Sequence, residues 1–330
     1  MPKIVSVLLF ILLGANSAFA STVYLQHDLP NSEVGYAVKV LRETLAEEAY
    51  SVTLSPGQVD FTIKLGVSVD YGPESFSLAS AGNRLSIRGG DKRGLIYGAL
   101  AVAEQLRNGR DIESIEVRRE SPAMPFRAIK HNLPWDSYRS SSALDLHYET
   151  ARDVRYWEAF LDMMAENRFN ALTLWNLHPF PYMIKPKNFP EATRFSDAEL
   201  AQWRQLYKAI FAMARERGID TYLVNWNVLV SEEFADAHDL EGNNYFPFYK
   251  GSADSRGEAQ TSDIVKRYTR ESVTQVLEEY PDLTGFGFSF GEQMGGMTPT
   301  ERQRWMDETI IAGMREADRP SKMIFRAPFS

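Results

Sequence analysis

The sequence contains no cysteine and only five histidines. Without cysteine the chain can form no disulfide, no thiolate nucleophile and no cysteine-ligated metal site. No two histidines have the spacing of a metal-binding motif such as H-E-x-x-H, so we expect no metal and no other cofactor. A G-x-S-x-G element, which would indicate a serine hydrolase, is also missing. Carboxylates are therefore the side chains left to carry acid–base chemistry.

The chain also lacks an excess of positive charge. Its formal net charge of −8 at pH 7 argues against nucleic acids and anionic membrane surfaces as partners. Hydrophobic residues make up 44% of the sequence and aromatic residues 12%, which is enough for a globular protein with a sizeable core. The composition leaves the oligomeric state open.

Residues 1–20 contain the only long apolar run and have the pattern of a signal peptide. Lys3 supplies the positive charge, residues 5–13 are apolar, and residues 18–20 (AFA) form a small-x-small cleavage site. The apolar run is too short to span a bilayer comfortably. We expect cleavage before Ser21, a periplasmic or extracellular protein, and no membrane insertion of the mature chain. An uncleaved anchor is the alternative.

Residues 21–121 predict a small α/β domain. We expect strands at 22–26, 61–67, 75–78 and 84–88. One helix is expected over 31–49, and a second helix follows the turn at 89–94 and ends at residue 105. The glycine-rich turn at 89–94 fits neither the dinucleotide-binding nor the P-loop pattern. Tight turning and close helix packing are therefore favoured over phosphate binding as the reason for these glycines.

From residue 122 onward, after two prolines, strands and helices alternate steadily. Strands are expected at 126–129, 170–175, 221–224, 285–290 and 322–326. This rhythm predicts a parallel sheet with right-handed crossovers. The loops that follow the strands are long and the loops that precede them are short, as in a (β/α)8 TIM-type barrel, which takes about 250 residues and eight strands. Residues 122–330 are thus predicted to be the first part of a catalytic barrel, truncated after about five strands.

The stretch that organises this second domain is residues 285–296, with the sequence GFGFSFGEQMGG. Its alternation of phenylalanines with glycine or serine predicts a strand that ends just before Glu292. Carboxyl ends of barrel strands carry catalytic residues, and a glutamate among aromatic rings can act as a general acid. A solvated loop glutamate is the alternative. Strict alternation places Glu292 on the phenylalanine side, so an inward direction requires a break at Gly291.

Polar and aromatic residues gather at the other predicted strand ends and suggest a sugar site. The candidate substrate-binding residues are Lys130, Asn132, Trp135, Trp175, Asn176, His178, Asn225, Trp226 and Arg326. Tryptophan rings stack on the apolar faces of pyranoses, and asparagine and histidine bond to hydroxyl groups. Lys130 or Arg326 could pair with a uronate carboxylate. Asp136, Glu232 and Glu233 are interpreted as solvated loop acids.

Three segments resemble a known family. Residues 126–130 (FRAIK), 169–180 (FNALTLWNLHPF) and 287–294 (GFSFGEQM) resemble the α-glucuronidase-like glycosyl hydrolases related to glycoside hydrolase family 67. Residues 85–98 (LSIRGGDKRGLIYG) are similar to the small N-terminal domain that these enzymes share with bacterial β-hexosaminidases. The resemblance implies a secreted glycoside hydrolase of oligosaccharides or polysaccharides that contain uronic acid, with Glu292 as general acid, inversion of configuration, and base carboxylates on later strands.

Two alternatives stay open. A β-N-acetylhexosaminidase would carry an aspartate just before the acid glutamate, and here that position is Gly291. A chain short of a catalytic base could instead be a non-catalytic carbohydrate-binding fragment. The sequence identifies neither the sugar nor the linkage.

Overall fold

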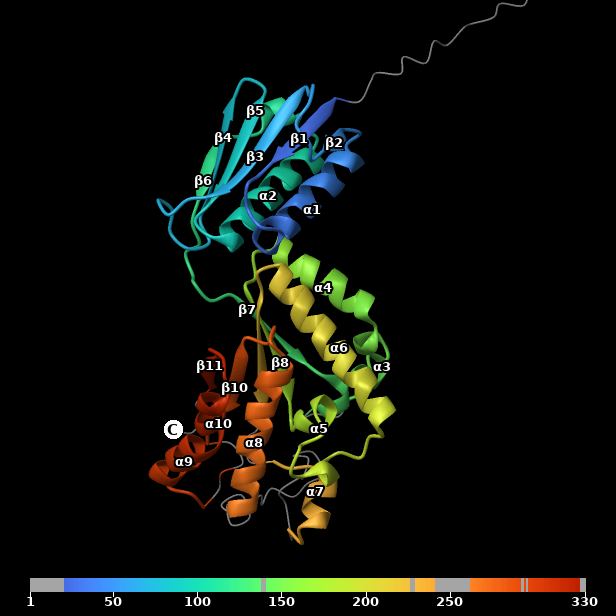
Figure 1. Ribbon diagram of the computed structural model, residues 1–330, viewed down its shortest axis with the longest axis vertical. Coiled ribbons are helices and arrows are strands. Elements are labelled where there is room, and N and C mark those ends of the chain that lie inside the picture. Colours follow the sequence, from blue (N-terminus) through green and yellow to red (C-terminus); the bar gives the residue numbers. More distant parts are fainter. Residues whose placement is uncertain are drawn as a thin grey trace, which may run out of the picture.

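The computed structural model describes residues 21–137, 141–225, 229–240, 262–291, 294 and 296–326. The predicted signal peptide, Trp226 and Glu292 lie outside these residues. The described chain forms two α/β domains, each built on one sheet, and the first domain lies at one end of the molecule (Figure 1). The strands of the first sheet end before residue 121, and those of the second sheet begin after residue 127. Within the described part of the chain, no helix is long and apolar enough to cross a bilayer.

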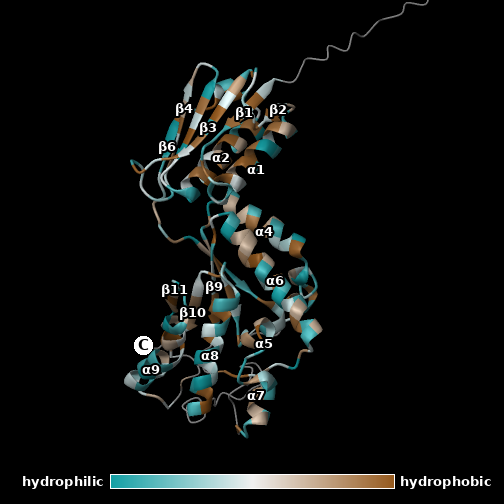
Figure 2. Ribbon diagram, viewed as in Figure 1, coloured by the Kyte–Doolittle hydropathy of each residue, from teal (hydrophilic) through white to brown (hydrophobic). Residues whose placement is uncertain are grey.

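The first domain has a six-stranded sheet with the order β2-β1-β3-β5-β4-β6. Its elements are β1 (Thr22–Gln26), α1 (Asn31–Glu47), β2 (Ser51–Thr53), β3 (Phe61–Val67), β4 (Phe76–Ala81), β5 (Arg84–Gly89), α2 (Lys92–Arg107) and β6 (Arg118–Glu120). Hydrophobic and hydrophilic residues alternate along β1 and β3, so that one face of the sheet is apolar, and α1 and α2 pack on the sheet (Figure 2). The short strands β2 and β6 were not predicted.

The glycines between β5 and α2 allow close packing, as the sequence predicts. A Cβ atom on Gly90 would lie 2.0 Å from the carbonyl oxygen of Gly72, and one on Gly94 would lie 2.1 Å from that of Ser75. Asp91 caps α2, because its side chain accepts a hydrogen bond from the backbone of Gly94 at 2.8 Å.

The second domain has a five-stranded parallel sheet with the order β11-β10-β9-β8-β7. The strands are β7 (Ala128–Asn132), β8 (Ala171–Asn176), β9 (Asp220–Asn225), β10 (Gly285–Ser289) and β11 (Lys322–Arg326). The helices are α3 (Ser142–Leu146), α4 (Val154–Glu166), α5 (Phe180–Met183), α6 (Asp197–Glu216), α7 (Glu232–Ala237), α8 (Asp263–Glu279), α9 (Pro299–Met306) and α10 (Ala312–Glu316). Each strand lies beside the next strand of the chain, which is the winding that (β/α) barrels use. The described strands form a sheet of this type and not a closed barrel.

The first strand of this sheet begins two residues later than predicted. Phe126 is 52% exposed, and the backbone N–H of Arg127 bonds to the side chain of Asn170 at 2.9 Å and not to a neighbouring strand. The parallel pairing starts only where Ala128 lies beside Ala171.

The two faces of the sheet differ, because side chains alternate along each strand. Leu174, Leu223 and Phe288 pack in one cluster with residues of α4, α6 and α8, and this side is here called the helix face. Trp175 and Tyr222 pack in a separate cluster on the opposite side, here called the inner face.

Glycine on β10 matches this arrangement. Gly287 lies on the inner face, where a Cβ atom would approach Cγ2 of Val224 to 2.6 Å, so a larger residue does not fit without a shift. The predicted alternation of phenylalanine with glycine or serine is therefore confirmed, with Phe286 and Phe288 on the helix face and Gly287 on the crowded inner face.

A buried carboxylate joins the two domains. Glu74 of the first domain is 7% exposed and accepts hydrogen bonds from Arg93 at 3.0 Å, from Asn170 at 2.8 Å and from Arg127. Burial raises the pKa of Glu74, but the bonds from Arg127, Asn170 and Arg93 outweigh it and hold the pKa below its ordinary value. Arg93 also pairs with Asp220 at 2.7 Å. The amino-terminal ends of β8 and β9 are thus tied to the first domain, and the carboxyl ends face away from it.

Candidate functional site

Two cations and a tryptophan meet on the inner face at the carboxyl ends of the strands. Nζ of Lys130 lies 3.9 Å from the ring centroid of Trp175, and Cζ of Arg326 lies 5.8 Å from it. Two hydrogen bonds also hold these side chains in place. The indole N–H of Trp175 donates to the hydroxyl of Thr173 at 3.1 Å, and Arg326 donates to the hydroxyl of Ser289 at 2.6 Å. Lys130 and Arg326 come from the two edge strands, so the curvature of the sheet brings them to one aromatic ring. The group places two positive charges beside a tryptophan ring that is 9% exposed, and it is here called the cationic site.

The three candidate asparagines divide between the two faces. Asn132 lies in register with Trp175 on the inner face, is half-buried, and has an Oδ1 atom with no hydrogen-bond partner among the described residues. Asn176 and Asn225 lie in register with each other and with Phe288, which places them on the helix face. They are 0% and 1% exposed. Their Oδ1 atoms also lack partners in the described part of the chain. Only Asn132 therefore shares a face with the cationic site.

A cavity of about 290 Å³ lies beside the strand ends. This hollow is here called the strand-end cavity. It is lined by Trp135, Asp136, Leu177, His178, Pro181, Tyr182, Arg194, Phe195, Leu229, Val230, Ser231, Glu232 and Glu233. Two predicted residues, Trp135 and His178, thus lie together here and not on the inner face. Most of the lining comes from the long loops after β7, β8 and β9.

Asp136 corrects the sequence interpretation of a solvated loop acid. Its carboxylate accepts a hydrogen bond from the backbone N–H of His178 at 2.8 Å. Burial raises the pKa of Asp136 to about 7, although the N–H of His178 and the charge of Arg194 act in the opposite direction. The carboxyl group can therefore hold or release a proton near neutral pH. No sequence pattern marked this residue, because its burial depends on loops from several strands. Glu232, in contrast, is exposed in the first turn of α7, as expected.

The histidines of this region are neutral. Nε2 of His178 lies 2.8 Å from the hydroxyl of Tyr268, and burial lowers the pKa of His178 to about 3. His131 follows Lys130 but lies on the other side of β7, with its ring 4.8 Å from that of Trp157, and burial lowers its pKa to about 4. Within the described ranges, no group of three or more histidine, aspartate or glutamate side chains could hold a metal ion.

Trp135 belongs to an aromatic cluster formed with Tyr182, Phe195 and Trp203. Its ring centroid lies 4.8 Å from that of Trp203, and its indole N–H donates to Tyr207 at 3.2 Å. This cluster is one wall of the strand-end cavity.

The backbone turns where the sequence analysis requires it. The strand β10 ends at Ser289, and Gly291 has a φ of +84° in the left-handed region. The alternation of β10 therefore stops before position 292. Glu292 and Trp226, the candidate acid and one candidate stacking residue, are outside the described residues, so their roles stay predictions.

No family model and no curated protein matches this chain. Among solved structures, it is similar to a GH138 enzyme targeting pectin rhamnogalacturonan II, with a TM-score of 0.75 and 25% identity over 90% of this chain and 33% of that one. It is also similar to a β-N-acetylhexosaminidase from Bacteroides fragilis, with a TM-score of 0.57 and 14% identity over 93% of this chain and 61% of that one. A mutant β-hexosaminidase from Streptomyces plicatus gives a TM-score of 0.59 and 12% identity over 92% of this chain and 61% of that one.

These structural neighbours are glycoside hydrolases. The chain spans about one third of the GH138 enzyme and about three fifths of the hexosaminidases. They support the glycosidase fold that the sequence predicts. The family 67 relationship is not shown by them and remains part of the proposal below.

Proposed function

We propose that this chain is part of a secreted glycoside hydrolase that acts on polysaccharide fragments containing uronic acid, in the manner of an α-glucuronidase. The observation that carries the proposal is the position of Lys130 and Arg326 beside the ring of Trp175. The carboxylate substituent of a uronic acid pairs with ammonium and guanidinium groups.

The structural comparison supports an acidic substrate. The similar GH138 enzyme is described as targeting pectin rhamnogalacturonan II, and pectins are plant polysaccharides rich in uronic acids. We therefore include pectic fragments among the expected substrates. The residues proposed to position the sugar are those of the cationic site and Asn132, which shares their face of the sheet.

Glu292 is the proposed general acid, which protonates the leaving oxygen. Its support is indirect: β10 ends at Ser289 and Gly291 turns the backbone just before it. Glycoside hydrolysis needs a second carboxylate as base or nucleophile. The resemblance to family 67 implies that this carboxylate belongs to a later strand. Secretion with cleavage after Ala20 completes the proposal, and the mass of the mature protein tests it.

A β-N-acetylhexosaminidase is the second candidate, favoured by the likeness to the hexosaminidase structures. It requires an aspartate just before the acid glutamate. Position 291 of this chain is a glycine, with a φ of +84°, so the required aspartate is missing. This departure counts against a hexosaminidase mechanism. A non-catalytic carbohydrate-binding role is the third candidate, and it predicts binding without turnover.

The decisive experiment compares nitrophenyl glucuronides and galacturonides with the matching neutral glycosides and with the N-acetylglucosaminide. Lys130→Met removes one charge and keeps most of the side-chain length. A hydrogen bond to a charged group is worth about 1.5–3 kcal/mol, so KM for uronides should rise by about 10- to 100-fold while neutral glycosides change little. Lys322→Met is the matched control, because Lys322 lies at the opposite end of β11 and pairs with Asp220. Preferred turnover of the N-acetylglucosaminide would overturn the proposal.

The role of Glu292 is tested separately with Glu292→Gln. Loss of a general acid slows the reaction by about 10²- to 10⁴-fold when the leaving group needs protonation, and far less with a dinitrophenolate leaving group. Equal losses on both substrates would remove Glu292 from the role of acid.

A further inference from the structure

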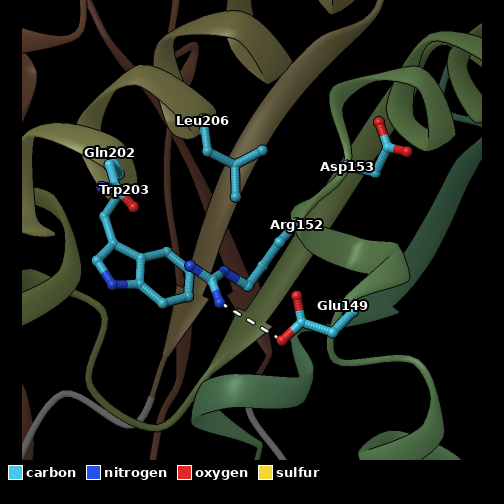
Figure 3. Close-up of a pocket in the computed structure, with 6 residues that line it drawn as sticks. All are labelled: Glu149, Arg152, Asp153, Gln202, Trp203 and Leu206. Atoms are coloured by element: carbon cyan, nitrogen blue, oxygen red, sulfur yellow. Dashed lines mark ion pairs between the residues drawn. The ribbon is translucent and has the colours of Figure 1, made fainter.

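A separate pocket of about 360 Å³ lies on the outer flank of the second domain. Its lining, here called the flank pocket, consists of Glu149, Arg152, Asp153, Gln202, Trp203 and Leu206 (Figure 3). The first three residues come from the 3-10 turn and the N-cap before α4, and the others come from the first turns of α6. None of these residues belongs to the cationic site.

Arg152 contacts two aromatic rings and one carboxylate at this pocket. Its guanidinium carbon lies 5.0 Å from the ring of Trp203 and 5.5 Å from the ring of Tyr148, and Nη1 lies 3.6 Å from a carboxylate oxygen of Glu149. In Figure 3 the guanidinium lies between the indole of Trp203 and the carboxylate of Glu149. An arginine fixed between two rings loses little entropy when it donates further hydrogen bonds, so it is prepared for a ligand.

The remaining groups have the chemistry of a sugar contact. Leu206 and the edge of Trp203 give a small apolar floor, while the amide of Gln202 can both donate and accept. The side chain of Glu149 is 81% exposed, and its carboxylate can accept bonds from neighbouring hydroxyls. Asp153 is paired with Arg155 at 2.7 Å, and Glu149 lies 3.6 Å from Arg152, so the pocket has no excess positive charge for a uronate and favours an uncharged sugar. The cationic site has the opposite preference.

The aromatic cluster connects this pocket with the strand ends. The ring of Trp203 lies 4.8 Å from that of Trp135 and 5.2 Å from that of Tyr182, and both of these residues line the strand-end cavity. The flank pocket and the strand-end cavity are thus in contact with the same aromatic cluster. We propose that the flank pocket is an accessory saccharide-binding site for neutral sugar units of the polymer. This inference rests on the proposed carbohydrate substrate and on no catalytic residue.

The test is a calorimetric titration of the full chain with neutral galacto-, arabino- and xylo-hexaoses, with hexagalacturonate as the acidic comparison. We expect saturable binding of at least one neutral probe. Gln202→Ala should weaken that binding by about three- to tenfold, the effect of one hydrogen bond, and Arg152→Ala should weaken it further. Gln205→Ala is the matched control, because Gln205 is exposed on the same helix and lies outside the pocket. It should bind as the unaltered protein does.

Three results would overturn the inference. The first is no saturable binding of any neutral probe, and the second is equal affinity in Gln202→Ala and the unaltered protein. The third is an Arg152→Ala variant that loses more affinity for hexagalacturonate than for the neutral probes. Gln202 is exposed, so its substitution leaves the fold intact even if Arg152→Ala unfolds. Turnover is not measured in this experiment. A failure of the proposed function would instead appear as the absence of uronide hydrolysis with neutral binding retained.

Discussion

The carboxyl group of Asp136 should make the stability of the second domain depend on pH. Burial raises its pKa from an ordinary value of 3.8 to about 7. The folded protein therefore keeps this proton up to about pH 7, while the unfolded chain releases it near pH 4. Between these values the unfolded state binds fewer protons, so the contribution of Asp136 to stability falls as pH rises. Asp136→Asn removes the ionisation and keeps an oxygen that can accept the N–H of His178.

The magnitude follows from the difference between the two pKa values. One pKa unit corresponds to about 1.4 kcal/mol, so ionised Asp136 lowers the free energy of unfolding at pH 8 by up to about 4 kcal/mol. At pH 4.5 the variant and the unaltered protein should agree within about 1 kcal/mol, the value of one hydrogen bond. At pH 8 Asp136→Asn should be the more stable protein by about 2–4 kcal/mol.

Urea unfolding followed by tryptophan fluorescence provides the measurement. All six tryptophans of the sequence lie after residue 121, so the signal reports the second domain. The difference between variant and unaltered protein, taken from pH 4.5 to 8.5, cancels the other titrating groups. Asp145→Asn is the control, because Asp145 is an exposed acid on the nearby helix α3. A difference that stays constant with pH, or that declines as pH rises, would show that Asp136 is solvated and refute the reasoning.

Two further predictions concern the fold. Glu74→Ala should lower the stability of the whole chain by about 3–5 kcal/mol, because it leaves the buried charge of Arg127 without its partner and Arg93 with Asp220 alone. Calorimetric melting checks this, and an unchanged melting temperature would contradict it. Gly287→Ala should destabilise by about 1–3 kcal/mol through overpacking against Val224, and Val224→Ala should recover part of that loss in the double variant. Purely additive losses in urea unfolding would show that the two sites do not touch.

Local signals in the sequence determined most of the secondary structure. The capping box at Ser196 and Glu199 begins α6, and the one at Thr298 and Glu301 begins α9. The strand at Lys322–Arg326 has the predicted bounds. These features depend on residues within a few positions of one another, so the sequence alone is sufficient for them. The absence of cysteine likewise excluded disulfides and thiolate chemistry without any structure.

The composition of the candidate site could be predicted only in part. Lys130, Trp175 and Arg326 were expected at strand ends, and the sheet brings them to one face. Asn176 and Asn225 were expected there too, but side-chain alternation continues to the ends of β8 and β9 and turns them toward the helices. A sequence places a residue at a strand end, and the register of the neighbouring strands decides which way it points.

Only the tertiary structure decided which charges are buried. Asp136 looked like an ordinary loop acid and Glu74 carried no signal, yet each is enclosed by segments far away in the sequence: the loop after β8 for Asp136, and Arg127 and Asn170 for Glu74. The free energy of a buried charge depends on the dielectric surroundings and on the donors that reach it. Those donors come from distant parts of the chain, so no local pattern can reveal them, and the fold determines both the pKa of these acids and the chemistry open to them.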